Sequence, residues 1–222
     1  ENRERVWFPF ATHKGLAEEV EGWLGQVRAR SRFGVLCPTQ QGDACALLDE
    51  MRLVKDAHEQ DIMRRAAQIS AQAHVRAMRR SARMIRNGEE VREYHLDAEL
   101  LHEFRQHGSQ YVAYGSIVAA GANACVLHYQ ADKAPVRAGE LVLIDAGCEL
   151  DGYASDITRT FPADGKFSGA QRALYDLVLA SKEAAIAVTK AGKRFNDPHD
   201  ATVAVLAQGM LDLGLLDRTK YG

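Results

Sequence analysis

Apolar residues recur at helical spacing in five segments of the chain and predict five amphipathic helices. These segments cover residues 15–31, 56–86, 90–107, 169–190 and about 198–213. The second begins with Asp56 and Glu59, which have the spacing of a capping box, and Ser168 and Gln171 give the fourth the same kind of start. The apolar stripe of the second helix consists of Ile62, Ala66, Ile69, Ala73 and Ala77.

Shorter apolar runs between these helices predict strands. Two lie near the start, at residues 32–38 and 44–54, and four lie in the middle, at residues 114–121, 125–129, 141–147 and 153–161. The order helix, helix, sheet, helix, helix indicates an α/β (α+β) fold with one and a half copies of a repeated unit. The pattern changes near Lys55, which predicts an N-terminal part over residues 1–54 and a second domain over residues 55–222.

Composition narrows the class of protein. Of the 222 residues, 46% are hydrophobic and 26% are charged, and the formal net charge is -2 at pH 7. The scattered charges give no electrostatic case for nucleic acid or a membrane surface as a partner, and no apolar run approaches the roughly 20 residues of a membrane helix. The four cysteines, Cys37, Cys45, Cys125 and Cys148, form no CxxC pair. We therefore expect reduced thiols, buried as small hydrophobes, in a cytoplasmic protein.

Two carboxylates stand in the predicted strands. Asp145 ends the aliphatic run of residues 141–144, which lacks alternation and predicts burial on both faces, and Asp156 lies in the next strand. A turn near residues 150–152 would fold the stretch into a hairpin. If the turn is centred between Leu150 and Asp151, Asp145 lies directly opposite Asp156, with Cβ atoms about 4.5–5.5 Å apart.

Like charges at that separation destabilise a sheet, and a divalent cation between them would remove the repulsion. Oxygen ligands on a rigid sheet suit Mn²⁺, Mg²⁺ or a similar hard ion, and two ions bridged by one carboxylate suit a hydrolytic site. The alternative is a surface hairpin with two solvated aspartates. From spacing alone both interpretations stay open.

Three stretches of the chain resemble one family. Residues 51–78, 94–129 and 128–179 are similar to the catalytic domain of the aminopeptidase P family, the Xaa-Pro aminopeptidases of the creatinase/methionine aminopeptidase, or pita-bread, superfamily. The third stretch, which contains LVLIDAGCELDGYASDITRTF, carries most of the likeness. The resemblance covers about residues 50–215, and residues 1–50 resemble the end of that family's N-terminal α/β domain only weakly.

The resemblance implies a metallopeptidase that releases the N-terminal residue from peptides with proline in second position. Two metal ions, usually Mn²⁺, would hold a bridging hydroxide that attacks the scissile carbonyl. The matching positions make Asp145 a chelating ligand of one ion and Asp156 a ligand between the two. His128 matches a histidine that contacts the substrate, and Thr158 is expected to support the ligands from the same strand face. A homo-oligomer, a dimer or a tetramer, is also implied.

The remaining ligands of the family, one His and two Glu, belong to later segments that this sequence does not contain. The chain also starts with Glu1 and stops at Gly222 after a helix-like segment. We therefore expect an incomplete pita-bread domain, its first half plus the helices of the second half, which is inactive alone and binds metal weakly or not at all. The alternatives are an Xaa-Pro dipeptidase and a non-catalytic pita-bread module that binds peptides or proteins; the retained Asp145 and Asp156 count against the module.

Other candidate groups have simpler interpretations. His95, Glu99 and His102 share one helix face, which we expect to be solvated, and His74 and His199 are expected at the surface or in capping roles. The basic segment of residues 76–86 is expected to be a solvated helix face rather than a nucleic-acid site.

Overall fold

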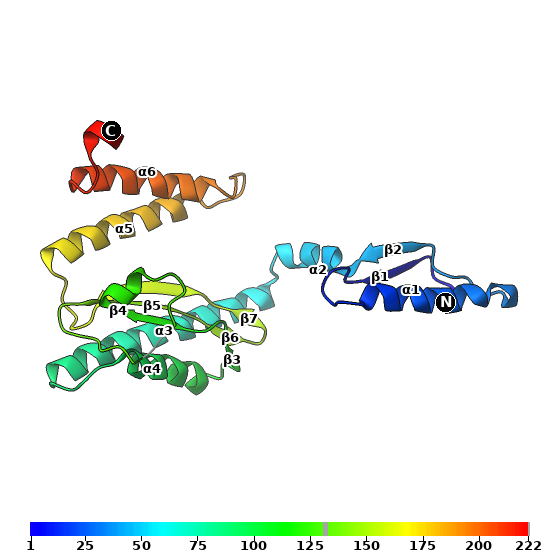
Figure 1. The fold of residues 1–222 in the computed structure, drawn as a ribbon, viewed down its shortest axis with the longest axis horizontal. Helices are drawn as coiled ribbons and strands as arrows, with labels where there is room; N and C mark the ends of the chain where they lie inside the picture. The colour runs from blue at the N-terminus through cyan, green and yellow to red at the C-terminus, as the bar shows by residue number, and fades with distance from the viewer. Residues whose placement is uncertain (131–132, 222) are drawn as a thin grey trace. The chain divides into compact units, whose positions relative to one another are not determined.

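A computed structural model describes residues 1–130 and 133–221, and it separates into two units, Glu1–Asp61 and Ile62–Gly222 (Figure 1). The helices are α1 (Leu16–Ala29), α2 (Ala44–Leu53), α3 (Ala57–Arg86), α4 (Glu93–Gln106), α5 (Gly169–Val188), α6 (Asp197–Asp212) and α7 (Arg218–Tyr221), with 3₁₀ turns η1 (Ser31–Phe33) and η2 (Gly121–Cys125). The strands are β1 (Arg5–Phe8), β2 (Gln40–Asp43), β3 (Tyr111–Val112), β4 (Ile117–Ala120), β5 (Leu141–Ala146), β6 (Cys148–Leu150), β7 (Tyr153–Ala154) and β8 (Ile157–Pro162).

The first unit is a parallel pair of strands, β1 and β2, with α1 packed against it through Phe8, Val20 and Leu24. Helix α1 was predicted, but the strand predicted over residues 44–54 is wrong, because α2 occupies it. Asp43 caps α2 by accepting from Cys45 N at 2.9 Å, and the Ala, Leu and Met residues that follow are strong helix formers. The strand predicted over residues 32–38 is also absent. The 3₁₀ turn η1 ends at Phe33, and Gly34, which follows it, has φ 78°, outside the range of a strand.

Helix α3 organises the second unit. Its predicted capping box is present: Glu59 N donates to Asp56 Oδ1 at 2.8 Å, and Asp56 N donates to Glu59 Oε2 at 2.7 Å. The predicted apolar stripe is buried and shares one core with residues of α4 and of the sheet. The α4 and sheet residues of that core include Leu96, Leu100, Phe104, Val118, Val142 and Ile144.

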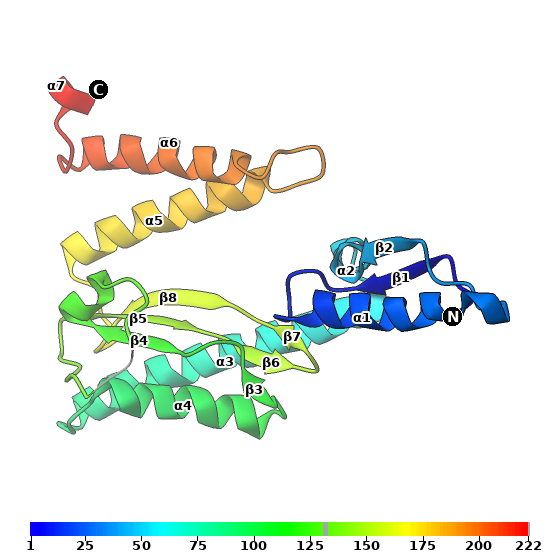
Figure 2. The same cartoon turned by 45° about the vertical axis from the view of Figure 1, so that its right-hand side comes forward.

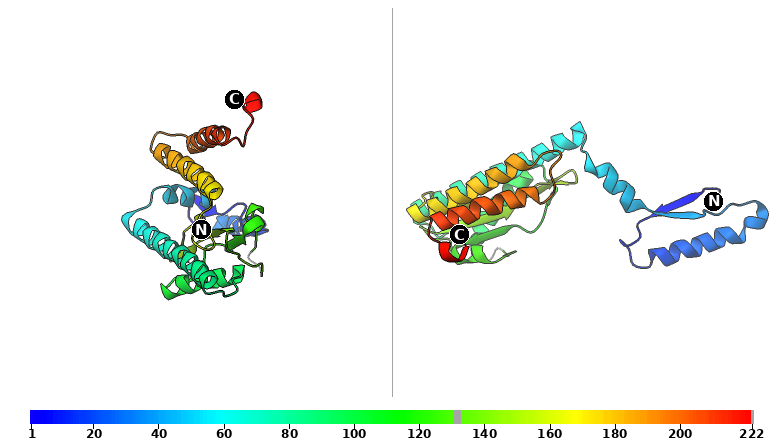
Figure 3. Two further views of the ribbon diagram at one scale, coloured as in Figure 1. Left: turned by 90° about the vertical axis from the view of Figure 1, so that its left-hand side faces the viewer. Right: turned by 90° about the horizontal axis from the view of Figure 1, so that it is seen from above.

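The strands of this unit form two antiparallel sheets, in the orders β4-β5-β8 and β3-β6-β7. Figures 2 and 3 show α3 and α4 on one side of the β4-β5-β8 sheet and the α5–α6 pair on the other. Strand β5 alternates between fully buried Val142, Ile144 and Ala146 and half-buried Leu141, Leu143 and Asp145. Burial on both faces was therefore a wrong prediction, because a groove of about 400 Å³ separates the second face from α5.

The α5–α6 pair begins with the predicted capping box, in which Ser168 N donates to Gln171 Oε1 at 2.9 Å and Gln171 N to Ser168 Oγ at 3.3 Å. The two helices approach closely at Gly209, where an added Cβ would lie 2.1 Å from Leu177 Cδ1. Several apolar side chains of the pair stay largely exposed, among them Leu174, Val178, Ile186 and Val203.

Ser70 ties α3 to the hairpin from inside the core. Its hydroxyl lies 2.7 Å from Ser155 Oγ and accepts from Cys148 N at 3.0 Å, while Ser155 Oγ donates to Cys148 O at 3.0 Å. All three residues are buried. Because Ser155 precedes Asp156, this network fixes the backbone next to a candidate ligand.

We expect Ser70→Ala to lower the free energy of unfolding by about 1 kcal/mol, because two buried hydrogen bonds are lost while Cys148 N and Ser155 Oγ still bond to each other at 3.1 Å. Urea denaturation of both variants measures the effect. Gln72→Ala, at an exposed position on the same helix, is the control and is expected to stay within about 0.5 kcal/mol of the unchanged chain. Equal losses in the two variants would contradict the role given to Ser70.

Candidate metal centre

The hairpin that contains β5 and β8 sets Asp145 and Asp156 on one face of the sheet. Asp145 pairs with Thr158, and the turn residues Asp151 and Gly152 have φ values of 50° and 83°, as a type I′ turn requires. The predicted register was wrong, because the turn is centred one position later than expected. The residue opposite Asp145 is therefore Thr158 instead of Asp156, a shift of two residues. Because this number is even, both carboxylates stay on the same face, and Asp156 becomes the diagonal neighbour of Asp145.

Gly147 allows the two hairpin segments to approach at this point. An added Cβ at Gly147 would lie 1.7 Å from Ser155 O. Ser155 N donates to Cys148 O and Ala113 N donates to Gly147 O, both at 2.9 Å. Backbone groups rather than side chains therefore fill the space behind the carboxylates.

Tyr114 joins the two carboxylates. Its hydroxyl lies 2.6 Å from Asp145 Oδ1 and 2.9 Å from Asp156 Oδ1. Burial, followed by the hydrogen bonds and negative charges of both aspartates, raises the pKa of Tyr114 far above its usual range, so the phenol keeps its proton. One proton cannot serve two carboxylates at once, so the charge of the pair is only partly compensated.

The sequence analysis missed Tyr114. It lies before β4 and has no motif of its own, and only the pairing of Ile117 with Asp145 brings it to the site. A neighbouring contact links the same loop to α4. Burial raises the pKa of Asp97 above its ordinary value, and a hydrogen bond to Ser116 opposes this shift without cancelling it.

His128 lines the same hollow as the carboxylates. This hollow, of about 380 Å³, is lined by Tyr114, Gly115, Ile117, His128, Gln130, Asp145 and Asp156. The strand predicted over residues 125–129 is wrong, because η2 ends at Cys125 and His128 has φ 54°. A non-glycine residue at positive φ cannot continue a strand. The exposed imidazole therefore reaches the hollow from a loop.

Thr158 is the direct cross-strand partner of Asp145. It is exposed and also lines the groove between the sheet and α5. The four residues predicted from the sequence thus lie together at one end of the sheet; the support that Thr158 would give to the ligands stays a prediction.

Comparison with known proteins identifies the family. Residues 61–221 match metallopeptidase family M24. The chain belongs to this family. Xaa-Pro aminopeptidase from Escherichia coli (strain K12) is 43% identical over 197 residues, which are 89% of this chain and 43% of the relative.

Solved structures of M24 relatives agree with this assignment. Aminopeptidase PepP from Pseudomonas aeruginosa superposes with a TM-score of 0.89 at 45% identity, covering 97% of this chain and 48% of that one. A zinc-substituted aminopeptidase P from Escherichia coli in complex with product gives a TM-score of 0.87 at 38% identity. The expected pita-bread fold is confirmed, and the chain spans about half the length of the relatives it matches.

The residues present fit a divalent ion as part of a ligand set. Asp145 and Asp156 offer hard carboxylate oxygens, their shared phenol leaves negative charge uncompensated, and Asp156 is exposed to an entering ion. Among residues 1–130 and 133–221, no three His, Cys, Asp or Glu side chains group closely enough to hold a metal. The two carboxylates are therefore candidates for ligands of a divalent ion.

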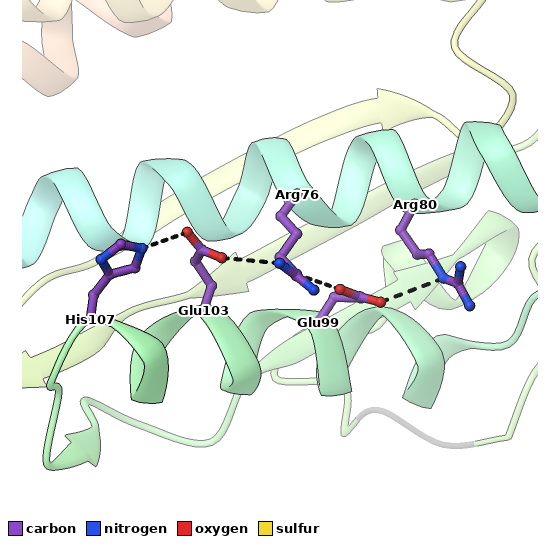
Figure 4. A network of polar contacts seen from close by, with 5 residues as sticks. All are labelled: Arg76, Arg80, Glu99, Glu103 and His107. Carbon is purple, nitrogen blue, oxygen red and sulfur yellow. Dashed lines mark hydrogen bonds and ion pairs between the residues drawn. The ribbon is translucent and has the colours of Figure 1, made fainter.

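The charged side chains between α3 and α4 form a network of ion pairs (Figure 4). Glu99 forms ion pairs with Arg76 and Arg80, and Glu103 lies 3.4 Å from Arg76 Nη1 and 3.0 Å from His107 Nε2. The prediction of a solvated face was wrong for Glu99, whose side chain is 20% exposed and pairs across the two helices, whereas its partners Arg76 and Arg80 stay 41% and 33% exposed. His102 is exposed, as predicted.

Two other sequence predictions need correction. His74 is buried rather than at the surface, with Nδ1 2.8 Å from Ser70 O, since its position on α3 faces the core; His199 is exposed, as predicted. Of the four free cysteines only Cys148 is buried, because Cys37 lies in a loop, Cys45 in the first turn of α2 and Cys125 at the end of η2. No helix within the described part of the chain has the length and apolar character to cross a membrane.

We expect Gly147→Ala to disrupt the hairpin, because its Cβ would overlap Ser155 O and force the backbone before Asp156 to move. Overpacking of this kind costs about 1–3 kcal/mol, and thermal unfolding measures it. Gly169→Ala is the matched control, since an added Cβ there meets nothing within 4 Å. An unchanged midpoint in Gly147→Ala would show that the hairpin tolerates a side chain here.

Proposed function

We propose that this chain carries half of the metal centre of an Xaa-Pro aminopeptidase, a hydrolase that releases the first residue of peptides whose second residue is proline. The observation that carries the proposal is the hollow in which Asp145, Asp156 and His128 meet, on a chain 43% identical to an Xaa-Pro aminopeptidase. The chain spans about half of that relative, so the activity is proposed for the whole protein.

In this proposal Asp145 and Asp156 would hold the metal, Asp145 as a ligand of one ion and Asp156 as a ligand of both, with Mn²⁺ as the expected metal. When bound, the ions would supply Lewis acidity and an activated water. The Tyr114 hydroxyl lies within hydrogen-bond distance of Oδ1 of both carboxylates, so it can donate to either one and limits how they turn. Thr158, opposite Asp145, limits the freedom of that strand.

His128 is proposed to contact the peptide substrate. It lies on a loop, is exposed and shares the hollow with both carboxylates, so it can reach a bound peptide without displacing a ligand. An imidazole can donate to a substrate carbonyl or accept from a peptide N–H.

The family resemblance further supports a homo-oligomer, and the four free cysteines agree with a reducing, cytoplasmic setting. Residues 1–54 are proposed to be the end of a separate N-terminal domain. The 222-residue chain alone is expected to bind Mn²⁺ weakly and to cleave no peptide, because its described residues offer only two ligands.

The test uses the product of the complete reading frame that encodes this chain. We expect bound Mn²⁺ by elemental analysis and release of the first residue from X-Pro peptides of three or more residues. Asp145→Asn and Asp156→Asn should each lower metal affinity at least about tenfold and abolish cleavage, since ligand carboxylates are lost.

Asp151→Asn is the matched control. It lies in the turn of the same hairpin, and asparagine adopts its positive φ readily, so metal content and rate should not change. Cleavage of X-Pro dipeptides only would indicate a dipeptidase instead. A metal-free product that binds peptides without cleaving them would indicate a non-catalytic module.

A further inference from the structure

Glu93 is a fully buried carboxylate outside the site described above. It is the first residue of α4, where the positive end of the helix dipole favours a negative charge. Burying a carboxylate nevertheless costs several kcal/mol unless hydrogen bonds compensate it. An apolar side chain would fill the same space at a lower free-energy cost. The hydrogen-bond partners of Glu93 therefore indicate which part of the structure its carboxylate stabilises.

The carboxylate accepts three hydrogen bonds from residues before and after His128. Oε1 accepts from Ala120 N and from Asn123 Nδ2, both at 2.9 Å, and Oε2 accepts from Tyr129 OH at 2.8 Å. Asn123 Nδ2 also donates to Tyr129 OH at 3.0 Å. One carboxylate thus connects the end of β4, the η2 turn and the residue after His128.

The loop itself has little apolar anchoring. Val126 is 55% exposed, Leu127 is 85% exposed, and His128 stands at positive φ. Asn123 and Tyr129 flank these three residues, and both are bound to Glu93. The polar contacts of Glu93 therefore fix the two ends of the segment that carries the imidazole into the hollow.

We propose that Glu93 is a positioning residue for His128: its buried carboxylate holds the η2 turn and Tyr129, and through them it keeps the imidazole in the hollow with Asp145 and Asp156. The structural part stands on the contacts above. The catalytic consequence rests on the proposed function.

The structural part is tested on the full 222-residue chain by amide hydrogen–deuterium exchange. Glu93→Leu keeps the bulk of the side chain but removes both acceptors, and exchange in residues 120–130 should accelerate by about tenfold or more. Glu93→Gln retains one acceptor and should lie between this variant and the unchanged chain. Glu89→Leu, at an exposed position just before the helix, should leave exchange in residues 120–130 unchanged.

Tyr129→Phe removes one hydroxyl, which donates to Glu93 and accepts from Asn123, and it serves if Glu93→Leu does not fold. It should accelerate exchange in residues 120–130 while α3 and β5 stay protected. Unchanged exchange in residues 120–130 would overturn the proposal, and so would an equal acceleration throughout the second unit, which would mean that Glu93 only stabilises the core.

The catalytic part is tested with the complete reading frame by a double-mutant cycle. Glu93→Gln should lower kcat/KM for an X-Pro peptide several-fold without changing metal content, and its effect should largely vanish in a His128→Ala background. Additive effects would overturn the positioning role. If the unchanged enzyme cleaves no X-Pro peptide, the proposed function fails, and the exchange experiment still decides the structural part.

Discussion

One phenol between two carboxylates sets the constraint on which the site depends. The Tyr114 hydroxyl lies within hydrogen-bond distance of both Asp145 and Asp156 but can donate its proton to only one of them at a time, and the hollow beside them is open to solvent or to a cation. The arrangement needs β4 beside β5, the β5–β8 hairpin in one register, and a residue without a side chain at Gly147. Each of these features helps to place the groups that line this hollow.

The apolar core alone does not fix the segments that surround this hollow. The stripe of α3 and the inner face of the sheet give a rigid base, but the segments that carry the functional groups are attached to it by buried polar contacts. Ser70 reaches from α3 to the backbone before Asp156, and Glu93 reaches from α4 to both sides of His128. A hydrogen bond fixes direction as well as distance, which dispersion contacts between aliphatic side chains do not.

Local patterns predicted the helices well, because capping boxes and apolar stripes act within a few residues of each other. Asp56 with Glu59 and Ser168 with Gln171 are examples whose side chains bond as expected. Predictions failed where the outcome depends on distant partners. The segment of residues 125–129 has the composition of a strand, but its neighbours bind Glu93, far away in the sequence, and so it forms a loop.

The candidate site could be predicted only in part. Asp145, Asp156 and His128 could be proposed because the chain resembles a family with a known arrangement, whereas Tyr114 carries no local signal and joins the site through strand pairing. The segment of residues 44–54 shows a further limit: apolar residues in a run fit a strand or a helix equally well, and the cap provided by Asp43 decides between them.

The pairing of Asp145 with Thr158 has a consequence for how this hairpin can vary among related sequences. Side chains alternate between faces along each strand, so a slip of the pairing by one residue would send one carboxylate to the opposite side of the sheet. A longer turn does not by itself cause such a slip, because a loop of three to five residues holds the extra residues outside the ladder. Insertions at the Asp151–Gly152 turn are therefore compatible with the site as long as Asp145 still pairs with Thr158.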